Sequence, residues 1–231
     1  MKTETPDKPA IDDRAGHRQR LRERFARNGL DGLQEYEAVE LLLSYAIMRR
    51  DVKPLAKALL RQYGSVEKLL DAPAAELMGR HGMGQSSAVL IRLIRELCAR
   101  YLEQRARAVN VLEDPGSIED FARMKLGGSS RETLMTIYLN ARSHIIGYDL
   151  TPGTVDHASI YLRELAKKAL LCNAVAVVLA HNHPSGICLP SPEDLRLTAS
   201  VRAALATFGI RLVDHLIVSP AECRHLPTET E

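Results

Sequence analysis

The stretch from His181 to Asp194, HNHPSGICLPSPED, constrains this chain more than any other segment. It follows the apolar run 174–180, which predicts a buried strand. Side chains two apart on a strand share a face, so the imidazoles of His181 and His183 can reach one point. The proline and glycine that follow predict a turn. The run 191–194, Ser-Pro-Glu-Asp, then predicts a helix start with serine at the N-cap and carboxylates in the first turn.

The predicted turn can return Asp194 to the two histidines. Two neutral imidazoles and one carboxylate suit Zn²⁺, and three protein ligands leave its fourth position open. The sequence therefore predicts a zinc site formed by His181, His183 and Asp194. Two alternatives stay open: a strand end and a helix cap without a metal, and a closed structural zinc with Cys188 as the fourth ligand.

The spacing His-x-His, seven residues, then Ser-x-x-Asp resembles the JAMM motif of the MPN domain, with Ser191 at the serine position. The string HNHPSG and the downstream run 212–215, Leu-Val-Asp-His, are similar to the bacterial RadC (UPF0758) family. The resemblance is specific across about 109–231 and looser over the N-terminal half. JAMM proteins include zinc isopeptidases that remove ubiquitin-like modifiers, and RadC-like proteins have long been described as DNA-repair factors.

This resemblance implies roles for particular residues. In JAMM enzymes the general base is a glutamate early in the domain, and the motif serine stabilises the oxyanion. Ser191 is therefore a candidate oxyanion donor, although an N-cap hydroxyl also faces its own helix amides. Glu132, which begins the first predicted strand, is the favoured base, and Glu164 on a later helix is its rival. The pair Asp214-His215 either orients a ligand imidazole or is ordinary polarity at the end of a strand.

Charge is distributed unevenly along the 231 residues, although the net charge is only +2. Residues 1–107 carry 20 Lys/Arg against 15 Asp/Glu, a net of +5, and residues 108–231 carry 11 against 14, a net of −3. We therefore expect two domains: a helical domain over 1–107 and an MPN-type domain over 108–231. The modestly basic first domain is a candidate for DNA binding.

The first domain is predicted to be helical, because apolar residues recur at helical spacing through 36–46, 52–63 and 85–101. The run 82–84, Gly-Met-Gly, resembles a helix-hairpin-helix element, in which backbone N–H groups at a helix N-terminus approach a DNA phosphate. A tight turn between packed helices explains the same glycines, so both interpretations stay open. Residues 1–13 are predicted to be a disordered tail.

The second domain is predicted to be α+β. A hairpin of strands over 133–151 precedes a helix over about 157–172, the metal-bearing strand, a helix over 192–208 and a last strand over 210–218. This order gives a mixed sheet with helices packed on it, as the MPN resemblance implies. The four cysteines show no paired short spacing, and the chain has no signal peptide and no long apolar run. We expect reduced thiols, a cytoplasmic location and no membrane partner.

Three functions compete at this point. The first is a zinc peptidase or isopeptidase that acts on a protein or peptide. The second is a DNA repair or recombination factor in which zinc is structural. A metal-dependent nuclease is disfavoured, because the site lacks the carboxylate clusters typical of two-metal phosphodiester cleavage. A glutamate close to the metal would favour the first function over the second.

Overall fold

A computed structural model of the chain describes residues 13–153, 158–220 and 222–226. Residues 1–12 of the predicted disordered tail lie outside the described residues. The chain divides into two compact units, Met1–Leu93 and Ile94–Glu231. Across the described ranges, no helix combines the length and the apolar character needed to cross a membrane.

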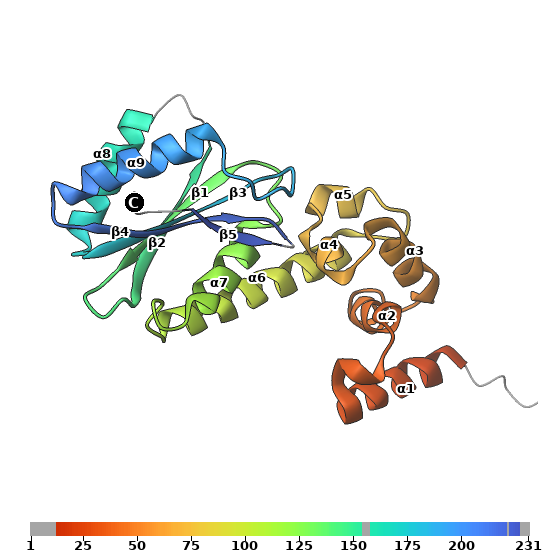
Figure 1. The fold of residues 1–231 in the computed structure, drawn as a ribbon. Helices are drawn as coiled ribbons and strands as arrows, with labels where there is room; N and C mark the ends of the chain where they lie inside the picture. The colour runs from red at the N-terminus through yellow and green to blue at the C-terminus, as the bar shows by residue number, and fades with distance from the viewer. Residues whose placement is uncertain (1–12, 154–157, 221, 227–231) are drawn as a thin grey trace, which may run out of the picture. The chain divides into compact units, whose positions relative to one another are not determined.

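The first unit is helical, as predicted (Figure 1). Its elements are α1 (Asp13–Asn28), η1 (Gly29–Gly32), α2 (Glu35–Ala46), α3 (Lys53–Tyr63), α4 (Val66–Asp71), α5 (Ala74–Met78) and the beginning of α6 (Gln85–Arg107). Local signals set their ends: α3 stops at Gly64, which adopts a left-handed φ of 83°, and Ser65 caps α4 by accepting from the Lys68 amide. The buried side chains of α2, α3 and α6 include Leu43, Leu59 and Ile91.

The glycine hairpin of the first unit joins α5 to α6. Gly82 adopts a φ of 92°, which is the conformation that requires glycine at this position. Arg50 donates a hydrogen bond to the Gly82 carbonyl, and the Gly84 amide donates to Ser87 Oγ at 2.9 Å. The Gly84 amide is therefore satisfied within the chain. DNA contact by this hairpin stays a prediction.

The second unit contains a five-stranded sheet in the order β2-β1-β3-β4-β5 (Figure 1). The pair β3–β4 is parallel and the other three pairs are antiparallel, so the predicted mixed sheet and the α+β class are confirmed. The strands are β1 (Thr133–Leu139), β2 (Ile145–Pro152), β3 (Ala176–Asn182), β4 (Arg211–Val218) and β5 (Cys223–Leu226), and the helices are α7 (Pro115–Leu126), α8 (Ala158–Leu171) and α9 (Pro192–Ala206). The short edge strand β5 was not among the predicted elements.

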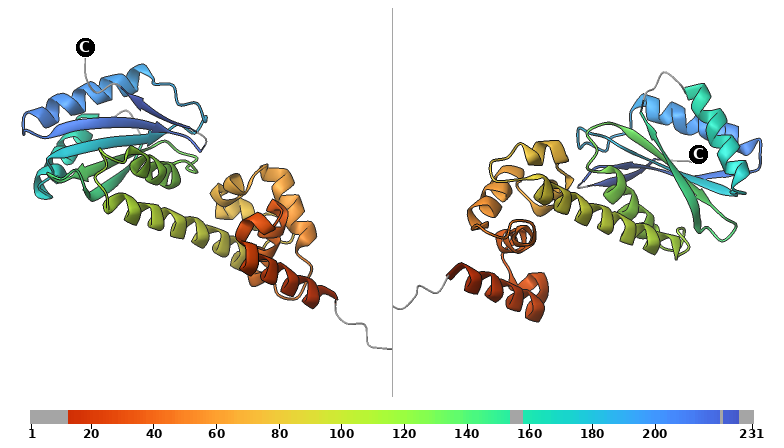
Figure 2. Two further views of the ribbon diagram at one scale, coloured as in Figure 1. Left: turned by 60° about the horizontal axis from the view of Figure 1, so that its bottom comes forward. Right: turned by 180° about the vertical axis from the view of Figure 1, so that it is seen from behind.

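Helices cover both faces of this sheet (Figure 2). On one face, β1 and β3 side chains such as Ile137 and Val178 pack against α7 and the end of α6. On the other face, side chains such as Val177 pack against α8 and α9. Because Leu102 and Ala106 of α6 belong to the first of these cores, the division between the units falls within α6. The predicted boundary at residues 107/108 lies at the end of that helix.

The pairing of β3 with β4 contains one extra residue. Val177 pairs with Leu212 and Val178 pairs with Asp214, so β4 contains one residue more than β3 at this step, as in a β-bulge. The extra residue shifts the alternation of side chains along β4 by one position. His215 therefore lies on the α9 face together with Leu212, whereas Asp214 lies on the α7 face.

The packing of Phe121 on α7 gives a test of this architecture. Its fully buried ring meets Tyr148 edge to face, with ring centroids 5.3 Å apart. We expect Phe121→Ala to lower the free energy of unfolding of the second unit by about 3–5 kcal/mol, measured by chemical denaturation. Phe208→Ala is the control, because that ring is 52% exposed and its loss should cost far less. Equal losses from the two variants would contradict the described core.

Candidate metal centre

The centre forms where β3 ends beside the start of β1. The two strands are antiparallel, and Leu134 lies opposite His181. The residues just before β1 therefore lie beside the end of β3. Glu132, His181, His183 and Asp194 each offer one ligand atom, and these atoms lie within 4.8 Å of one another. The structure therefore brings the three predicted ligands and the predicted base into one group that can hold a metal ion.

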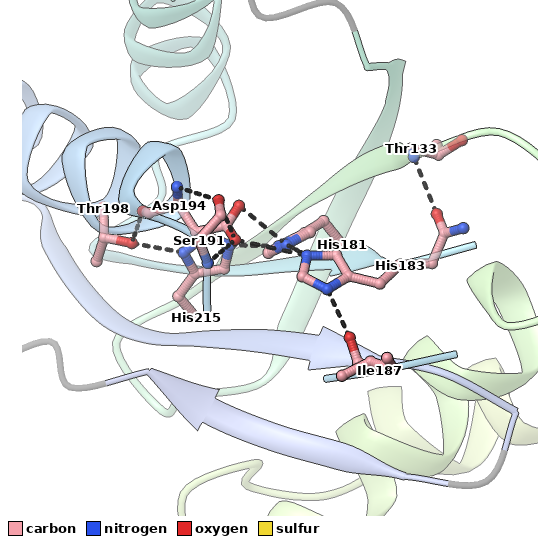
Figure 3. Close-up of polar contacts among 9 residues, drawn as sticks. Thr133, His181, His183, Ile187, Ser191, Asp194, Thr198 and His215 are labelled. Atoms are coloured by element: carbon pink, nitrogen blue, oxygen red, sulfur yellow. Dashed lines mark hydrogen bonds and ion pairs between the residues drawn. The ribbon is translucent and has the colours of Figure 1, made fainter. Parts of the chain in front are cut away.

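The distances within the group are short (Figure 3). His181 Nε2 lies 3.1 Å from Asp194 Oδ1 and 2.9 Å from His183 Nε2, and His183 Nε2 lies 3.5 Å from Asp194 Oδ2. The side chains of His181 and Asp194 are buried, that of His183 is 17% exposed, and Glu132 is exposed. The centre is therefore closed on its inner side and open to solvent on the side of Glu132.

The N-terminus of α9 fixes the carboxylate of Asp194. Ser191 is the N-cap, and its hydroxyl accepts from the Asp194 amide at 3.1 Å. In return, Asp194 Oδ2 accepts from the Ser191 amide at 2.8 Å and from the Ser191 hydroxyl at 2.7 Å. This reciprocal capping leaves Oδ1 to face His181. Burial alone would raise the pKa of the Asp194 carboxyl, but its contact with His181 and its hydrogen bonds from Ser191 outweigh this effect and hold that pKa well below its ordinary value.

The loop after β3 fixes the ring of His183. Its Nδ1 lies 2.8 Å from the carbonyl oxygen of Ile187, and a carbonyl only accepts, so the proton is on Nδ1. The Nε2 atom of His183 therefore directs its lone pair toward the centre. Gly186 makes the return of the loop possible with a φ of 81°, and its amide donates to the His183 carbonyl at 2.9 Å.

Two further side chains lie behind His181. His181 Nδ1 is 2.9 Å from Nε2 of His215, whose Nδ1 is 2.7 Å from Oγ1 of Thr198 (Figure 3). Burial lowers the pKa of His215 to about 3, and the positive charge that His181 carries when it is protonated would lower this pKa further. Of the pair Asp214-His215, only His215 approaches a candidate ligand, because Asp214 points to the other face and pairs with His225 at 2.7 Å.

Asn182 connects β3 to the segment that carries Glu132. It lies between the two histidines in sequence but points to the opposite face. Its Oδ1 accepts from the Thr133 amide at 2.9 Å, and its Nδ2 donates to the carbonyls of Ser129 and Arg131, each at 3.2 Å. These bonds fix the backbone on both sides of Glu132. This role of Asn182 was not predicted from the sequence, although a buried amide at the end of a strand indicates a hydrogen-bond partner in a neighbouring segment.

Thr198 was also missed by the sequence analysis. It follows Asp194 by four residues on a helix, and this spacing places the two side chains on one face. Its hydroxyl lies 2.6 Å from the Asp194 carbonyl oxygen. The four-residue spacing between Asp194 and Thr198 was therefore the sequence pattern that could have predicted this contact.

The remaining candidates lie apart from the group. Glu164, the rival base, is exposed on α8 and pairs with Lys167 at 3.7 Å. Cys188 is buried beside Ile217, and its thiol points to the Glu222 carbonyl oxygen at 3.5 Å. Among the described residues, the group that can hold a metal ion includes neither of these two side chains.

Known proteins resemble this chain over both units. Residues 112–228 match the RadC-like JAB domain, and residues 14–89 match the UPF0758 N-terminal domain. A UPF0758 protein of Fusobacterium nucleatum is 35% identical over 215 residues, which cover 90% of this chain and 93% of that protein. A UPF0758 protein of Ruegeria pomeroyi is 37% identical over 203 residues, which cover 87% and 91%. A third, from Burkholderia mallei, is 36% identical over 202 residues, which cover 87% and 73%.

The ligand set can be tested by elemental analysis of the purified chain. We expect His183→Ala to abolish stoichiometric metal, because it removes one of three converging ligands. Cys188→Ser should keep the metal with near-normal affinity, since the thiol points away from the centre. Full retention of metal by His183→Ala would contradict the ligand set, and a large loss in Cys188→Ser would support a closed site.

The role of Asn182 can be tested by hydrogen exchange. Asn182→Ala leaves the Thr133 amide and two carbonyls without their partner, so we expect a loss of about 1–3 kcal/mol of stability. Exchange of the Thr133 amide should become faster while metal binding by the histidines persists. Asn182→Asp is the matched control, because it keeps the acceptor for Thr133. Unchanged exchange at Thr133 in Asn182→Ala would show that this residue does not fix the Glu132 segment.

Proposed function

Because the chain belongs to the UPF0758 family and carries a RadC-like JAB domain, we propose that it is a zinc-dependent hydrolase of peptide or isopeptide bonds. The observation that carries this proposal is the position of Glu132. A carboxylate on the open side of a two-histidine, one-aspartate group is the arrangement that hydrolysis needs, with three ligands and a separate proton acceptor.

The donor set fits zinc. Neighbouring ligand atoms around a tetrahedral zinc with bonds of about 2.0–2.1 Å are roughly 3.3 Å apart. His181 Nε2 lies 2.9 Å from His183 Nε2 and 3.1 Å from Asp194 Oδ1, and His183 Nε2 lies 3.5 Å from the other carboxylate oxygen, Oδ2. Imidazole nitrogen together with carboxylate oxygen is also a common zinc ligand combination. These distances and donor types support zinc over a hard cation such as Mg²⁺, which prefers oxygen ligands.

In this proposal each residue has a distinct task. Zinc, when bound, supplies Lewis acidity that acidifies water and polarises a carbonyl. Glu132 accepts the proton of the attacking water and returns it to the leaving amine. Ser191 is the candidate donor to the oxyanion. Its hydroxyl donates to Asp194 in this structure, but it can turn away because Asp194 Oδ2 keeps the bond from the Ser191 amide.

The rim of the centre supports a polypeptide substrate. Ile187 and Leu189 in the loop after β3, and Leu195 in the first turn of α9, are each at least half exposed. Ile187 lies beside the centre, since its carbonyl holds His183. Exposed apolar side chains at such a rim suit side chains of a peptide or protein better than a phosphate backbone. We propose that these three residues contact the substrate.

The same position of Glu132 also supports a second candidate function. A carboxylate this close can act as a fourth ligand, and a four-ligand zinc is typically structural. The chain would then be a DNA repair or recombination factor whose zinc stabilises the second unit. The two functions differ in what Glu132 does to metal affinity.

The variant Glu132→Gln distinguishes the hydrolase from the DNA factor with a structural zinc. If Glu132 is the general base, the variant should keep its zinc and fold, and hydrolysis should fall by about 10²–10⁴-fold. The measurement is a rate on peptide and isopeptide probes, with chelator treatment and zinc re-addition, beside a metal titration. Glu164→Gln is the matched control and should leave both unchanged, because that side chain lies apart from the centre.

Two outcomes would contradict the hydrolase. A large loss of zinc affinity in Glu132→Gln would make Glu132 a ligand and favour the structural alternative. Absence of zinc-dependent cleavage of every probe by the wild-type chain, together with tight stoichiometric zinc, would point the same way.

A further inference from the structure

We propose that Thr198 and His215 act as positioning residues that keep a proton on Nδ1 of His181 and so direct its Nε2 lone pair toward the metal. This inference rests on the proposed function, since it concerns how one proposed zinc ligand is prepared. It follows from which atom donates in each of three consecutive hydrogen bonds. The Asp194 carbonyl oxygen and the buried ring of His215 determine these donors.

The direction is set at the Asp194 end. Thr198 Oγ1 lies 2.6 Å from the Asp194 carbonyl oxygen, and a carbonyl only accepts, so the single hydroxyl proton is donated there. The same Oγ1 lies 2.7 Å from Nδ1 of His215. With its proton already donated, the hydroxyl can only accept in this second contact. The proton between them therefore belongs to Nδ1 of His215.

The next hydrogen bond joins His215 to His181. The ring of His215 is fully buried, and its two nitrogens meet a hydroxyl and another imidazole, both neutral groups. A doubly protonated ring in this position would be a buried charge without a carboxylate partner, which is costly. Nε2 of His215 is therefore unprotonated and accepts at 2.9 Å, so Nδ1 of His181 donates.

His181 therefore carries its proton on the same ring nitrogen as His183. Both rings carry their proton on Nδ1, one donating to His215 and the other to the Ile187 carbonyl, and both present an unprotonated Nε2. These two Nε2 atoms are 2.9 Å apart. Two lone pairs at this distance repel unless a cation or proton lies between them. The hydrogen bonds behind the histidines thus prepare the pair for a metal ion.

Asp194 belongs to both ends of this chain of hydrogen bonds. Its Oδ1 faces His181 Nε2 at 3.1 Å, and its main-chain oxygen anchors the Thr198 hydroxyl. The first turn of α9 therefore positions the carboxylate ligand and also orients the imidazole ligand on β3. A change in Thr198 should act on the metal without any direct contact with it.

Thr198→Val tests the inference, because valine keeps the branched shape of threonine and has a methyl group in place of the hydroxyl. We expect its zinc affinity, measured by competition with a chromophoric chelator, to fall by about 10–100-fold. Thr198→Ser should restore the affinity, because serine supplies the same hydroxyl. A valine variant that folds and binds zinc as tightly as the wild type would overturn the inference, as would failure of the serine variant to restore the loss.

A second measurement reads the tautomer directly. In the wild-type chain, with or without zinc, long-range ¹H–¹⁵N NMR correlations should show a proton on Nδ1 of His181 and, for His215, a protonated Nδ1 and an unprotonated Nε2. In Thr198→Val, His215 should lose this single tautomer. A proton on Nε2 of His215 in the wild type would overturn the inference even if Thr198→Val does not fold. A wild-type chain that binds no zinc would instead contradict the proposed function, while the NMR result would still decide the direction of the hydrogen bonds.

Discussion

The alternation of side chains along β3 is the constraint on which the rest of the centre depends. Because both faces of this strand are buried, its register cannot slip by one residue without moving apolar side chains away from their cores. The same alternation sends His181 and His183 to the α9 face and Asn182 to the α7 face. The strand therefore presents two imidazoles to one neighbour and an amide to another. Core packing fixes these directions before any metal binds.

Helix capping and ligand placement are one structural feature in this protein. The reciprocal hydrogen bonds between Ser191 and Asp194 are those that stabilise many helix N-termini. Here they also hold one carboxylate oxygen and leave the other facing His181. The stability of the first turn of α9 and the geometry of the centre therefore depend on the same few atoms.

The parts of the site that local spacing determines could be predicted from sequence. A strand, a His-x-His pair, a turn and a Ser-x-x-Asp helix start lie within 21 residues, 174–194, and their geometry follows from standard strand and cap rules. The family was predicted from the same residues, and the comparisons confirm it. Glu132 was proposed from the resemblance alone, because its approach to the histidines depends on pairing between β1 and β3 across about fifty residues. The partners of Asn182 required the same long-range pairing, and sequence patterns do not report it.

The contribution of β4 shows why the remainder could not be predicted. On a regular strand, His215 would lie on the face opposite Leu212, and Asp214 would share the face of Leu212. The extra residue at Val213 reverses this assignment. The direction of His215 therefore depends on its pairing with Leu179 and not on its spacing from Leu212. A chain without Val213 would pair as a regular strand, with Leu212 still opposite Val177 and His215 still opposite Leu179, so His215 would keep its direction toward His181. The bulge therefore allows β4 to carry one residue more than β3 at this step while His215 keeps its place beside His181.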